Sequence, residues 1–342
     1  MVRIIAECAQ GYLADNIDES INLAKWLVKS AKYSGADAVK FQLILADELC
    51  TPDYKYYALS KKLELGFEGW QSICDLSKNI EIELIFDIFG LQSFQMAEML
   101  EVKEVKLHPT DFRNKILLNA VANSSQITSV IAGCGGSLYE EIKNTLMTLG
   151  NNKLITLLHG FQGYPTPLDQ NCLDRIKILN KLCEEYGSNI QIGFADHASP
   201  ISSESTHLAA MAVGLGVKVL EKHITLAKCL KLEDYESALS PDEFQNFVNI
   251  IKNINSSRGN AKQSSSLFDL PPSENKYREF CIRHVVTRKD LKIGQVIRES
   301  DICLKRSSSK EPITEIKDVI GKKLIKNKSA NQFLVQSDFN HE

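Results

Sequence analysis

The sequence predicts a (β/α)8 barrel of the TIM-barrel type, followed by a small β-rich domain. Eight short apolar runs alternate with amphipathic stretches over roughly the first 250 residues, the length that eight βα units occupy. A Ser-rich segment follows, and after it come short β-like runs with turn signals between them. An open, doubly wound sheet is the alternative. We favour the barrel because eight strands of similar character suit closure.

The predicted strands are rich in Val, Ile and Leu and lack strict polar alternation, as expected of strands that are buried on both faces. They span residues 3–7, 37–42, 82–87, 102–108, 127–133, 154–160, 190–196 and 217–223.

Helical patterns separate these strands. In residues 17–33, apolar side chains recur at the spacing of one helix face. Similar patterns occupy 111–122, 139–149, 171–186 and 203–213. Gly35, Gly187 and Gly216 stand where helices should end. The connection from 43 to 80 is longer, so we expect extra loop structure there.

Composition divides the chain into three parts. We expect a catalytic barrel at residues 1–254 and a linker at 255–276, which is polar and Ser-rich and contains Pro271–Pro272. Residues 277–342 form the small β-rich domain.

The charge and the cysteines exclude several classes of protein. The 342 residues carry a net charge of −3, with 40 basic and 43 acidic side chains, so we expect no binding to nucleic acid or an anionic membrane. Nine cysteines without CxxC spacing argue against a disulfide framework or a structural zinc site. The N-terminus is no signal peptide, and no run of about 18 apolar residues could span a membrane. We therefore expect a cytoplasmic protein.

Ionisable side chains end seven of the eight predicted strands. In a closed βα barrel, the carboxyl ends of the strands form the rim where chemistry takes place. Lys and Glu are rarely buried without partners, so packing alone does not account for this set. Its members are Glu7, Lys40, Asp87, Lys106, His108, His159, Asp196, His197, Glu221, Lys222 and His223.

His197 and His223 end neighbouring strands, which lie roughly 5 Å apart in a sheet. Two imidazoles in this position can ligate one divalent metal and leave coordination positions open for water and substrate. The alternative is two histidines held by ordinary hydrogen bonds.

Lys40 and Lys106 are candidates for binding a phosphate or carboxylate, and the alternative is that they form salt bridges with Glu7 or Asp87. The glycine-bearing turn at 133–136 offers backbone N–H groups that could cradle a phosphate. These patterns predict a metal-dependent barrel enzyme acting on a phosphorylated or carboxylated small molecule.

Six ordered motifs resemble the sialic acid synthase family, the N-acetylneuraminate synthases and their bacterial relatives for legionaminate and pseudaminate. They are IAE (5–7), VKFQ (39–42), HGFQGYPTP (159–167), FADH (194–197), EKHIT (221–225) and DYESALSPDEF (234–244). The tail, from KDLKIGQVIRESDICLKR (289–306) to GKKLIKNKSANQFLVQSDF, resembles the SAF (antifreeze-like, β-clip) domain.

The resemblance implies a reaction for surface-glycan synthesis. Phosphoenolpyruvate (PEP) condenses with the open-chain aldehyde of an N-acyl aminohexose, which gives a nine-carbon 2-keto acid of the sialic, legionaminic or pseudaminic type and phosphate. A divalent metal, Mn2+ or Mg2+, polarises the aldehyde. One alternative is an enzyme with the same fold but a different reaction, a metal-dependent aldolase or epimerase. A degenerate sugar-binding homologue is another.

Site residues follow from the same resemblance, position by position. His197 and His223 match the metal ligands, and Glu7 matches a carboxylate that contacts the sugar. Glu221 is a candidate acid or base near the metal. The remaining matches are Lys40 and Gln42 as PEP-side contacts, Lys106 in the basic site of the fourth strand, and Tyr164 and Asp234 on the sugar side.

Arg306 matches an arginine that reaches into the sugar site of the partner subunit, which implies a domain-swapped homodimer.

The chain departs from the family pattern on the PEP side. The phosphate loop usually reads Ser-Thr-Gly-Met, whereas Gly133-Cys134-Gly135-Gly136 carries no hydroxyl. Ala195 stands where a Ser commonly precedes the Asp-His pair, and Lys106-Leu-His-Pro-Thr-Asp111 replaces a Lys-x-x-Ser-Gly-Glu/Asp motif. These changes indicate a divergent subgroup with an altered sugar or a weakened PEP site.

Overall fold

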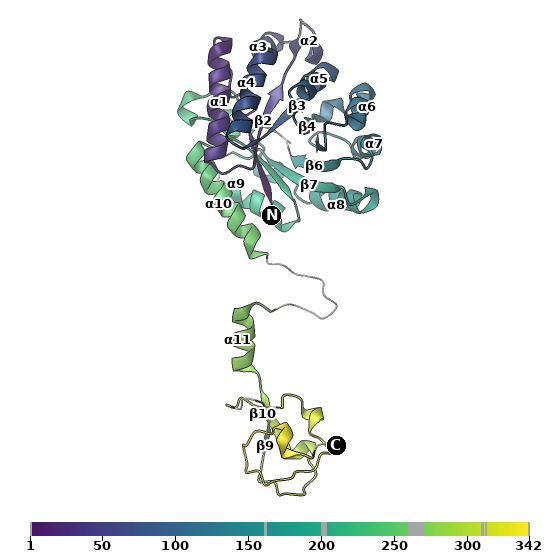
Figure 1. Ribbon diagram of the computed structural model, residues 1–342, viewed down its shortest axis with the longest axis vertical. Coiled ribbons are helices and arrows are strands. Elements are labelled where there is room, and N and C mark those ends of the chain that lie inside the picture. The colour runs from purple at the N-terminus through teal and green to yellow at the C-terminus, as the bar shows by residue number, and fades with distance from the viewer. Residues whose placement is uncertain are drawn as a thin grey trace. The chain divides into compact units, whose positions relative to one another are not determined.

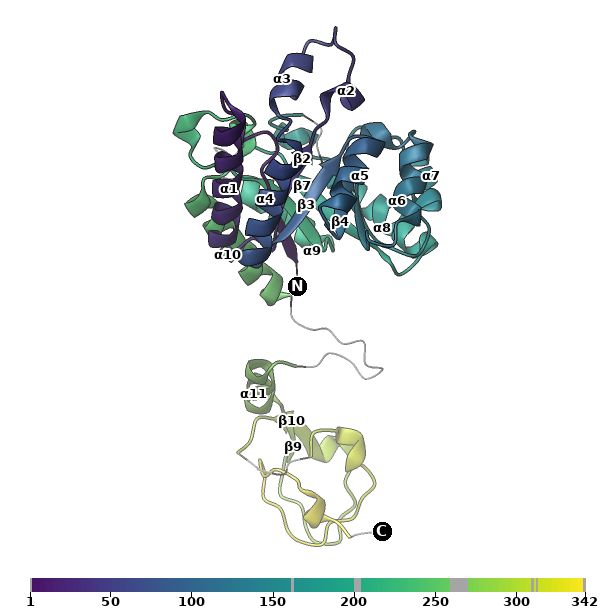
Figure 2. The same cartoon turned by 45° about the horizontal axis from the view of Figure 1, so that its top comes forward.

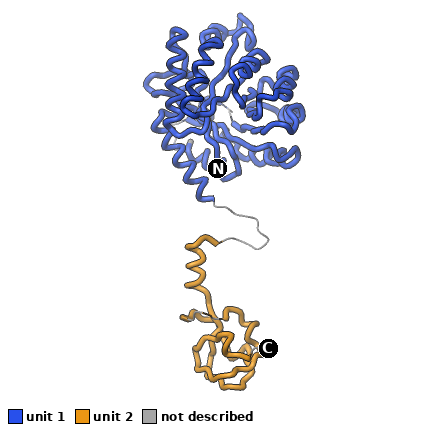
Figure 3. Tube along the Cα trace, viewed as in Figure 1, with its two compact units in different colours: residues 1–259 blue, residues 260–342 orange. Residues whose placement is uncertain are grey.

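The chain divides into two compact units, residues 1–259 and 260–342 (Figure 3). The computed structural model describes residues 2–160, 163–199, 204–258, 270–308, 311 and 313–340.

Eight parallel strands close the barrel of the first unit in chain order, with β8 pairing back onto β1 (Figure 1). The strands are β1 (Arg3–Glu7), β2 (Ala38–Leu43), β3 (Glu83–Ile88), β4 (Glu104–Leu107), β5 (Ser129–Gly133), β6 (Leu154–Gly160), β7 (Ile190–Asp196) and β8 (Val219–His223). All eight predicted strands and the barrel are therefore confirmed.

Helices surround the strands, and Figure 2 shows α2 and α3 standing out beyond their neighbours. The helices of this unit are α1 (Ile17–Tyr33), α2 (Ala46–Leu49), α3 (Tyr57–Lys62), α4 (Gly66–Asn79), α5 (Leu91–Met99), α6 (Lys115–Asn123), α7 (Tyr139–Leu149), α8 (Arg175–Tyr186), α9 (Glu204–Gly214) and α10 (Pro241–Ser257).

The helices differ from the predictions at particular places. Helix α5 was not predicted, and α6 begins at Lys115 rather than near 111 because Pro109–Asp111 form a 3-10 turn. The segment predicted as a linker, 255–276, contains the end of α10 and the start of α11 (Pro272–Cys281), and its residues 259–269 lie outside the described part of the chain.

Strand alternation sorts the side chains of the barrel into inward and outward sets. An apolar layer fills the interior: Ile5, Ala38, Ile85, Ile131, Leu158, Ala195 and Val219. Two residues further along the same strands come Glu7, Lys40, Asp87, Gly133, Gly160, His197 and Glu221. The polar site therefore rests directly on the apolar layer, at the carboxyl ends of the strands.

The same alternation turns three of the expected rim groups away from the mouth. His159 Nε2 bonds the carbonyl oxygen of Asn171 at 2.8 Å, and its ring stacks on Phe194. Lys222 pairs with Asp196 at 3.1 Å, and both are almost fully buried. The prediction that they belong to the rim was wrong, because each lies one residue out of phase with the inward set.

The second unit has its own small core beneath a sparse sheet. Strands β9 (His284–Thr287) and β10 (Ile302–Lys305) pair antiparallel, and isolated bridges such as Val286–Phe333 and Val296–Lys323 join the rest. Its core residues include Val285, Leu291, Ile297, Ile302, Ile313, Val319, Leu324, Leu334 and Phe339. Among the described residues of the whole chain, no helix is long and apolar enough to cross a membrane.

Candidate active site

A cavity of about 480 Å³ opens at the carboxyl ends of the barrel strands. Its wall is polar along one arc, from the end of β7 through β8 and β1 to β4, whereas β5 and β6 line it with Gly133, Leu158 and Gly160. The lining residues include Glu7, Gln10, Gln42, Tyr56, Asp87, Lys106, His108, Gly133, Gly160, Tyr164, Ala195, His197, Glu221, His223 and Asp234.

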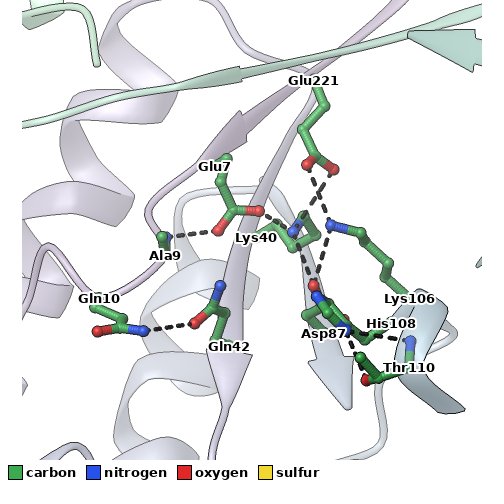
Figure 4. Close-up of polar contacts among 10 residues, drawn as sticks. All are labelled: Glu7, Ala9, Gln10, Lys40, Gln42, Asp87, Lys106, His108, Thr110 and Glu221. Atoms are coloured by element: carbon green, nitrogen blue, oxygen red, sulfur yellow. Dashed lines mark hydrogen bonds and ion pairs between the residues drawn. The ribbon is translucent and has the colours of Figure 1, made fainter. Parts of the chain in front are cut away.

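The floor of the cavity is a cluster of two lysines and three carboxylates (Figure 4). The Lys40 ammonium contacts the Glu7 carboxylate and lies 3.6 Å from both Asp87 and Glu221. Lys106 lies 3.0 Å from Asp87 and 3.4 Å from Glu221. Both lysines therefore have carboxylate partners, as the salt-bridge alternative proposed.

Burial and mutual charge set the protonation of this cluster. Burial lowers the pKa of Lys40 to about 8, against the opposing effect of Glu221. Burial alone would raise the pKa of Asp87 and of Glu221, but the nearby Lys106 and Lys40 hold both below their usual range. Burial would lower the pKa of Lys106, but the charges of Asp87 and Glu221 outweigh this effect and raise it. At neutral pH these four groups are charged.

His197 and His223 lie face to edge at the mouth of β7 and β8, with ring centroids 5.0 Å apart. Burial lowers the pKa of His197 to about 4 and that of His223 well below its usual value. Both rings are therefore neutral at pH 7, the form in which imidazole binds metals.

Hydrogen bonds at Nδ1 orient both rings. His197 Nδ1 lies 3.2 Å from the carbonyl oxygen of Ala195 and so carries the proton. The Tyr164 hydroxyl donates its proton to the Asp234 carbonyl, so His223 Nδ1, 3.5 Å away, donates to the Tyr164 oxygen. Such bonds at Nδ1 orient the rings of metal-binding histidines.

The donor set fits a divalent ion held by two imidazoles. In the part of the chain that the structure describes, no group of three or more His, Cys, Asp or Glu side chains is arranged as a metal site. Two imidazoles alone would leave coordination positions for water and substrate, as catalytic sites do.

Further polar groups line the cavity beyond the cluster. Gln10 donates to Gln42 at 3.2 Å across the ends of β1 and β2. Burial raises the pKa of Asp234 to about 6, and Asp234 adopts a left-handed backbone conformation.

Glycines and Leu158 form the wall at β5 and β6. A Cβ at Gly133 would lie 3.2 Å from Pro109 Cδ and 3.5 Å from Lys106 Cε, and one at Gly160 would overlap the Ala195 carbonyl. The Cys134 N–H is used by the Leu158 carbonyl at 2.8 Å, so the predicted phosphate cradle at 133–136 lacks this donor.

Most predicted site residues meet in this cavity. Glu7, Gln42, Lys106, Tyr164, His197, Glu221, His223 and Asp234 line it. Lys40 is fully buried and reaches the others through the carboxylates that it contacts. Arg306 belongs to the second unit, where it is exposed and its guanidinium lies 5.8 Å from the centroid of the Phe280 ring.

Four lining residues with polar side chains were not among the predicted site residues. Asp87 and His108 stand at strand ends, and strand alternation places them inward with Lys40 and Lys106, so the signal was present. Gln10 and Tyr56 lie in loops after β1 and β2, where no periodicity places a side chain.

Comparison with known proteins identifies the family. The NeuB family matches residues 27–263, and the SAF domain matches residues 282–340. The chain belongs to the NeuB family.

Several of its relatives are synthases of sugar acids. The chain is 30% identical to the N,N'-diacetyllegionaminic acid synthase of Legionella pneumophila, over 97% of this chain and 93% of that protein. It is 25% identical to the pseudaminic acid synthase of Campylobacter jejuni, over 99% and 96%. The crystal structure of the N-acetylneuraminic acid synthetase of Leptospira borgpetersenii, in complex with citrate, matches with a TM-score of 0.70 and 25% identity, over 82% of this chain and 92% of that one. Membership of this family makes the chain an enzyme of the condensing, transferase type.

Proposed function

We propose that this NeuB-family chain condenses PEP with the open-chain aldehyde of an N-acyl aminohexose. The product is a nine-carbon 2-keto sugar acid, and phosphate is released, as a step in surface-glycan synthesis. The observation that carries the proposal is the meeting, in one cavity, of two neutral histidines, His197 and His223, with the charged Lys106. These are groups for polarising a carbonyl and for holding an anion.

The proposed chemistry forms one bond and breaks another. Carbon 3 of PEP attacks the aldehyde carbon, and the aldehyde oxygen takes up a proton. Water adds to carbon 2 and loses a proton. The bond from carbon 2 to the phosphate oxygen then breaks, its electron pair leaves with phosphate, and the carbon 2 hydroxyl loses a proton to give the ketone.

Each wall of the cavity has a part in this reaction. Lys106 and Gln42 hold the anionic substrate, PEP, while Tyr164, Asp234 and Glu7 surround the sugar. Glu221 is ionised at neutral pH and lies beside Lys106, so it is suited to accept a proton from the attacking water. His197 and His223 would hold Mn2+ or Mg2+, which when bound polarises the aldehyde oxygen as a Lewis acid.

We also propose a cytoplasmic, domain-swapped homodimer. All nine cysteines are free, which suits a reducing compartment. In the dimer, Arg306 of each chain would reach the sugar site of the other, as the family resemblance implies.

A panel assay tests the proposed function. Purified protein is incubated with PEP, Mn2+ or Mg2+ and a series of N-acyl aminohexoses, and phosphate release and product mass are measured. We expect phosphate release that depends on both metal and sugar, with a product three carbons longer than the acceptor. Sugar turnover without PEP consumption would instead indicate an aldolase or epimerase, and sugar binding without any turnover would indicate a degenerate binding protein.

A further inference from the structure

His108 lies at the carboxyl end of β4, on the same side of the strand as Lys106. Pro109 follows it, and a residue before proline is held in an extended conformation, which His108 adopts with φ −69° and ψ 143°. The strand alternation therefore continues for one more residue beyond β4, and the ring lines the cavity. Phe89 packs against the imidazole with ring centroids 5.3 Å apart and limits its rotation.

The neighbours of the ring define which nitrogen carries the proton. Thr110 N–H, which can only donate, points at His108 Nδ1 from 3.5 Å, and the Thr110 hydroxyl lies 2.8 Å from the same nitrogen. Nδ1 is therefore an acceptor, and the proton sits on Nε2. A neutral imidazole in this state presents one N–H donor away from Thr110.

The charges of the floor create a need for such a donor. Three carboxylates face two ammonium groups in the cluster of Glu7, Asp87, Glu221, Lys40 and Lys106, so no positive charge is in excess for an incoming anion. Among the described residues that line the cavity, Lys106 is the one lysine or arginine, and it already contacts Asp87 and Glu221.

Other sources of donors on this side are closed by packing. Gly133, on the strand beside β4, has little room for a hydroxyl-bearing side chain, because its Cβ would lie 3.2 Å from Pro109 Cδ and 3.5 Å from Lys106 Cε. Gly160 is likewise blocked by the Ala195 backbone. A hydrogen-bond donor for the anion therefore comes from β4, because the glycines of β5 and β6 have little room for side chains that carry one.

We propose that His108 binds the anionic group of the substrate directly, donating from Nε2 beside Lys106. In this chain the residue takes over the donor role that side chains on β5 and β6 lack. The inference rests on the proposed function, because it takes PEP as the anion. It places the phosphate or carboxylate of PEP at the end of the cavity that β4 forms.

Equilibrium binding tests the assignment without turnover. Isothermal titration calorimetry measures the Kd of PEP and of inorganic phosphate, in the absence of sugar, for the wild-type protein and three variants. We expect His108→Ala to weaken PEP binding by at least roughly tenfold, the usual loss for a hydrogen bond to a charged group. His108→Gln, which keeps an N–H donor near the Nε2 position, should remain within about threefold of wild type.

Arg113→Ala is the matched control. Arg113 is exposed, follows the same loop and pairs with Glu141 outside the cavity, so its loss should leave both Kd values unchanged. In parallel, the imidazole ¹H–¹⁵N spectrum should show the His108 Nε2 resonance moving on addition of inorganic phosphate. Circular dichroism checks that the variants fold, and His108→Gln carries the test if His108→Ala does not.

The outcomes separate this inference from the proposed function. His108→Ala with wild-type affinity for PEP and phosphate, or a His108 resonance that phosphate does not move, would overturn the role of His108 while PEP turnover stands. Wild-type protein that binds phosphate but neither binds nor consumes PEP would overturn the proposed function, and the phosphate titration would still decide the role of His108. Wild-type protein that binds neither anion would overturn both.

Discussion

Glu7, Asp87 and Glu221 bring three carboxylates under the mouth of the barrel, and Lys40 and Lys106 keep Asp87 and Glu221 ionised there. Desolvation of such groups is costly, and removal of one partner from a buried pair typically costs about 3–5 kcal/mol. The cluster therefore adds little to the stability of the fold. It is nevertheless rigid, because each charged group is held in place by the oppositely charged groups around it. Its rigidity keeps Lys106 and Glu221 in place beside the histidine pair.

At the residue scale, His223→Ala should abolish turnover and leave the fold intact. The side chain supplies one of two neutral imidazoles, and its loss leaves a single imidazole to hold the ion. We expect turnover to fall by roughly 10³-fold or more and Mn2+ binding, followed by calorimetry, to weaken in parallel. His207→Ala, which removes an exposed histidine of α9, is the control. Wild-type activity of His223→Ala in metal-replete buffer would rule out the ligand role.

Asp234 should make stability depend on pH. Burial raises its pKa to about 6, assisted by Glu233 and Glu236 and opposed by a bond from the Gln10 backbone. The folded chain therefore binds this proton more tightly than the unfolded chain, and the contribution of Asp234 to the free energy of unfolding falls as pH rises from about 4 through 6.

The Asp234→Asn variant imitates the protonated acid and tests whether the free energy of unfolding falls as pH rises. We expect the variant to be more stable than wild type in urea at pH 8 and to lose this advantage at pH 5. Its KM for the sugar should rise at pH 8, because the carboxylate is gone. An equal stability difference at both pH values would show that Asp234 does not titrate in this range.

At the scale of elements, the packing of the cavity wall at β5 and β6 depends on glycine. Gly160 ends β6 with φ 137°, which disfavours other residues, and its Cβ would overlap the Ala195 carbonyl in β7. Since His197 directly follows β7, a shift of this backbone moves a proposed metal ligand.

Gly160→Ala should therefore lower the free energy of unfolding by about 2–5 kcal/mol and reduce activity in the surviving folded protein. Chemical denaturation gives the first quantity and the phosphate-release assay the second. Gly214→Ala is the control, because this residue ends α9 with open space around its Cα. A Gly160→Ala protein as stable as that control would contradict the packing argument.

For the whole molecule, the proposed exchange of tails between two chains makes a quantitative prediction. His223→Ala and Arg306→Ala should each be inactive alone. In a mixed dimer, one barrel combines an intact His223 with the intact Arg306 of the other chain, so random mixing should restore about a quarter of wild-type activity. The measurement is phosphate release after the two proteins are unfolded and refolded together. No recovery in a mixture whose dimers are confirmed by sedimentation would mean that each tail serves its own barrel.

The sequence alone predicts those features of the fold and the site that follow from a local pattern. Apolar runs and the family motifs predicted all eight strands, and His197, His223, Glu221 and Lys106 were found because they end strands. Helix α5 was missed, although its apolar residues pack on the barrel. Gln10 and Tyr56 were missed because loop side chains obey no period.

The sequence by itself determined the barrel, the SAF domain and the set of polar residues at the strand ends, because a strand imposes its period of two and its direction on every side chain. Only the tertiary structure decided which of those residues share a cavity. It turned His159, Asp196 and Lys222 outward, joined Lys40 and Lys106 to three carboxylates from other strands, and brought Pro109 and Lys106 against Gly133. The physical reason is that barrel closure places neighbouring strands in a definite register, and the charges and free volume that result belong to several strands at once.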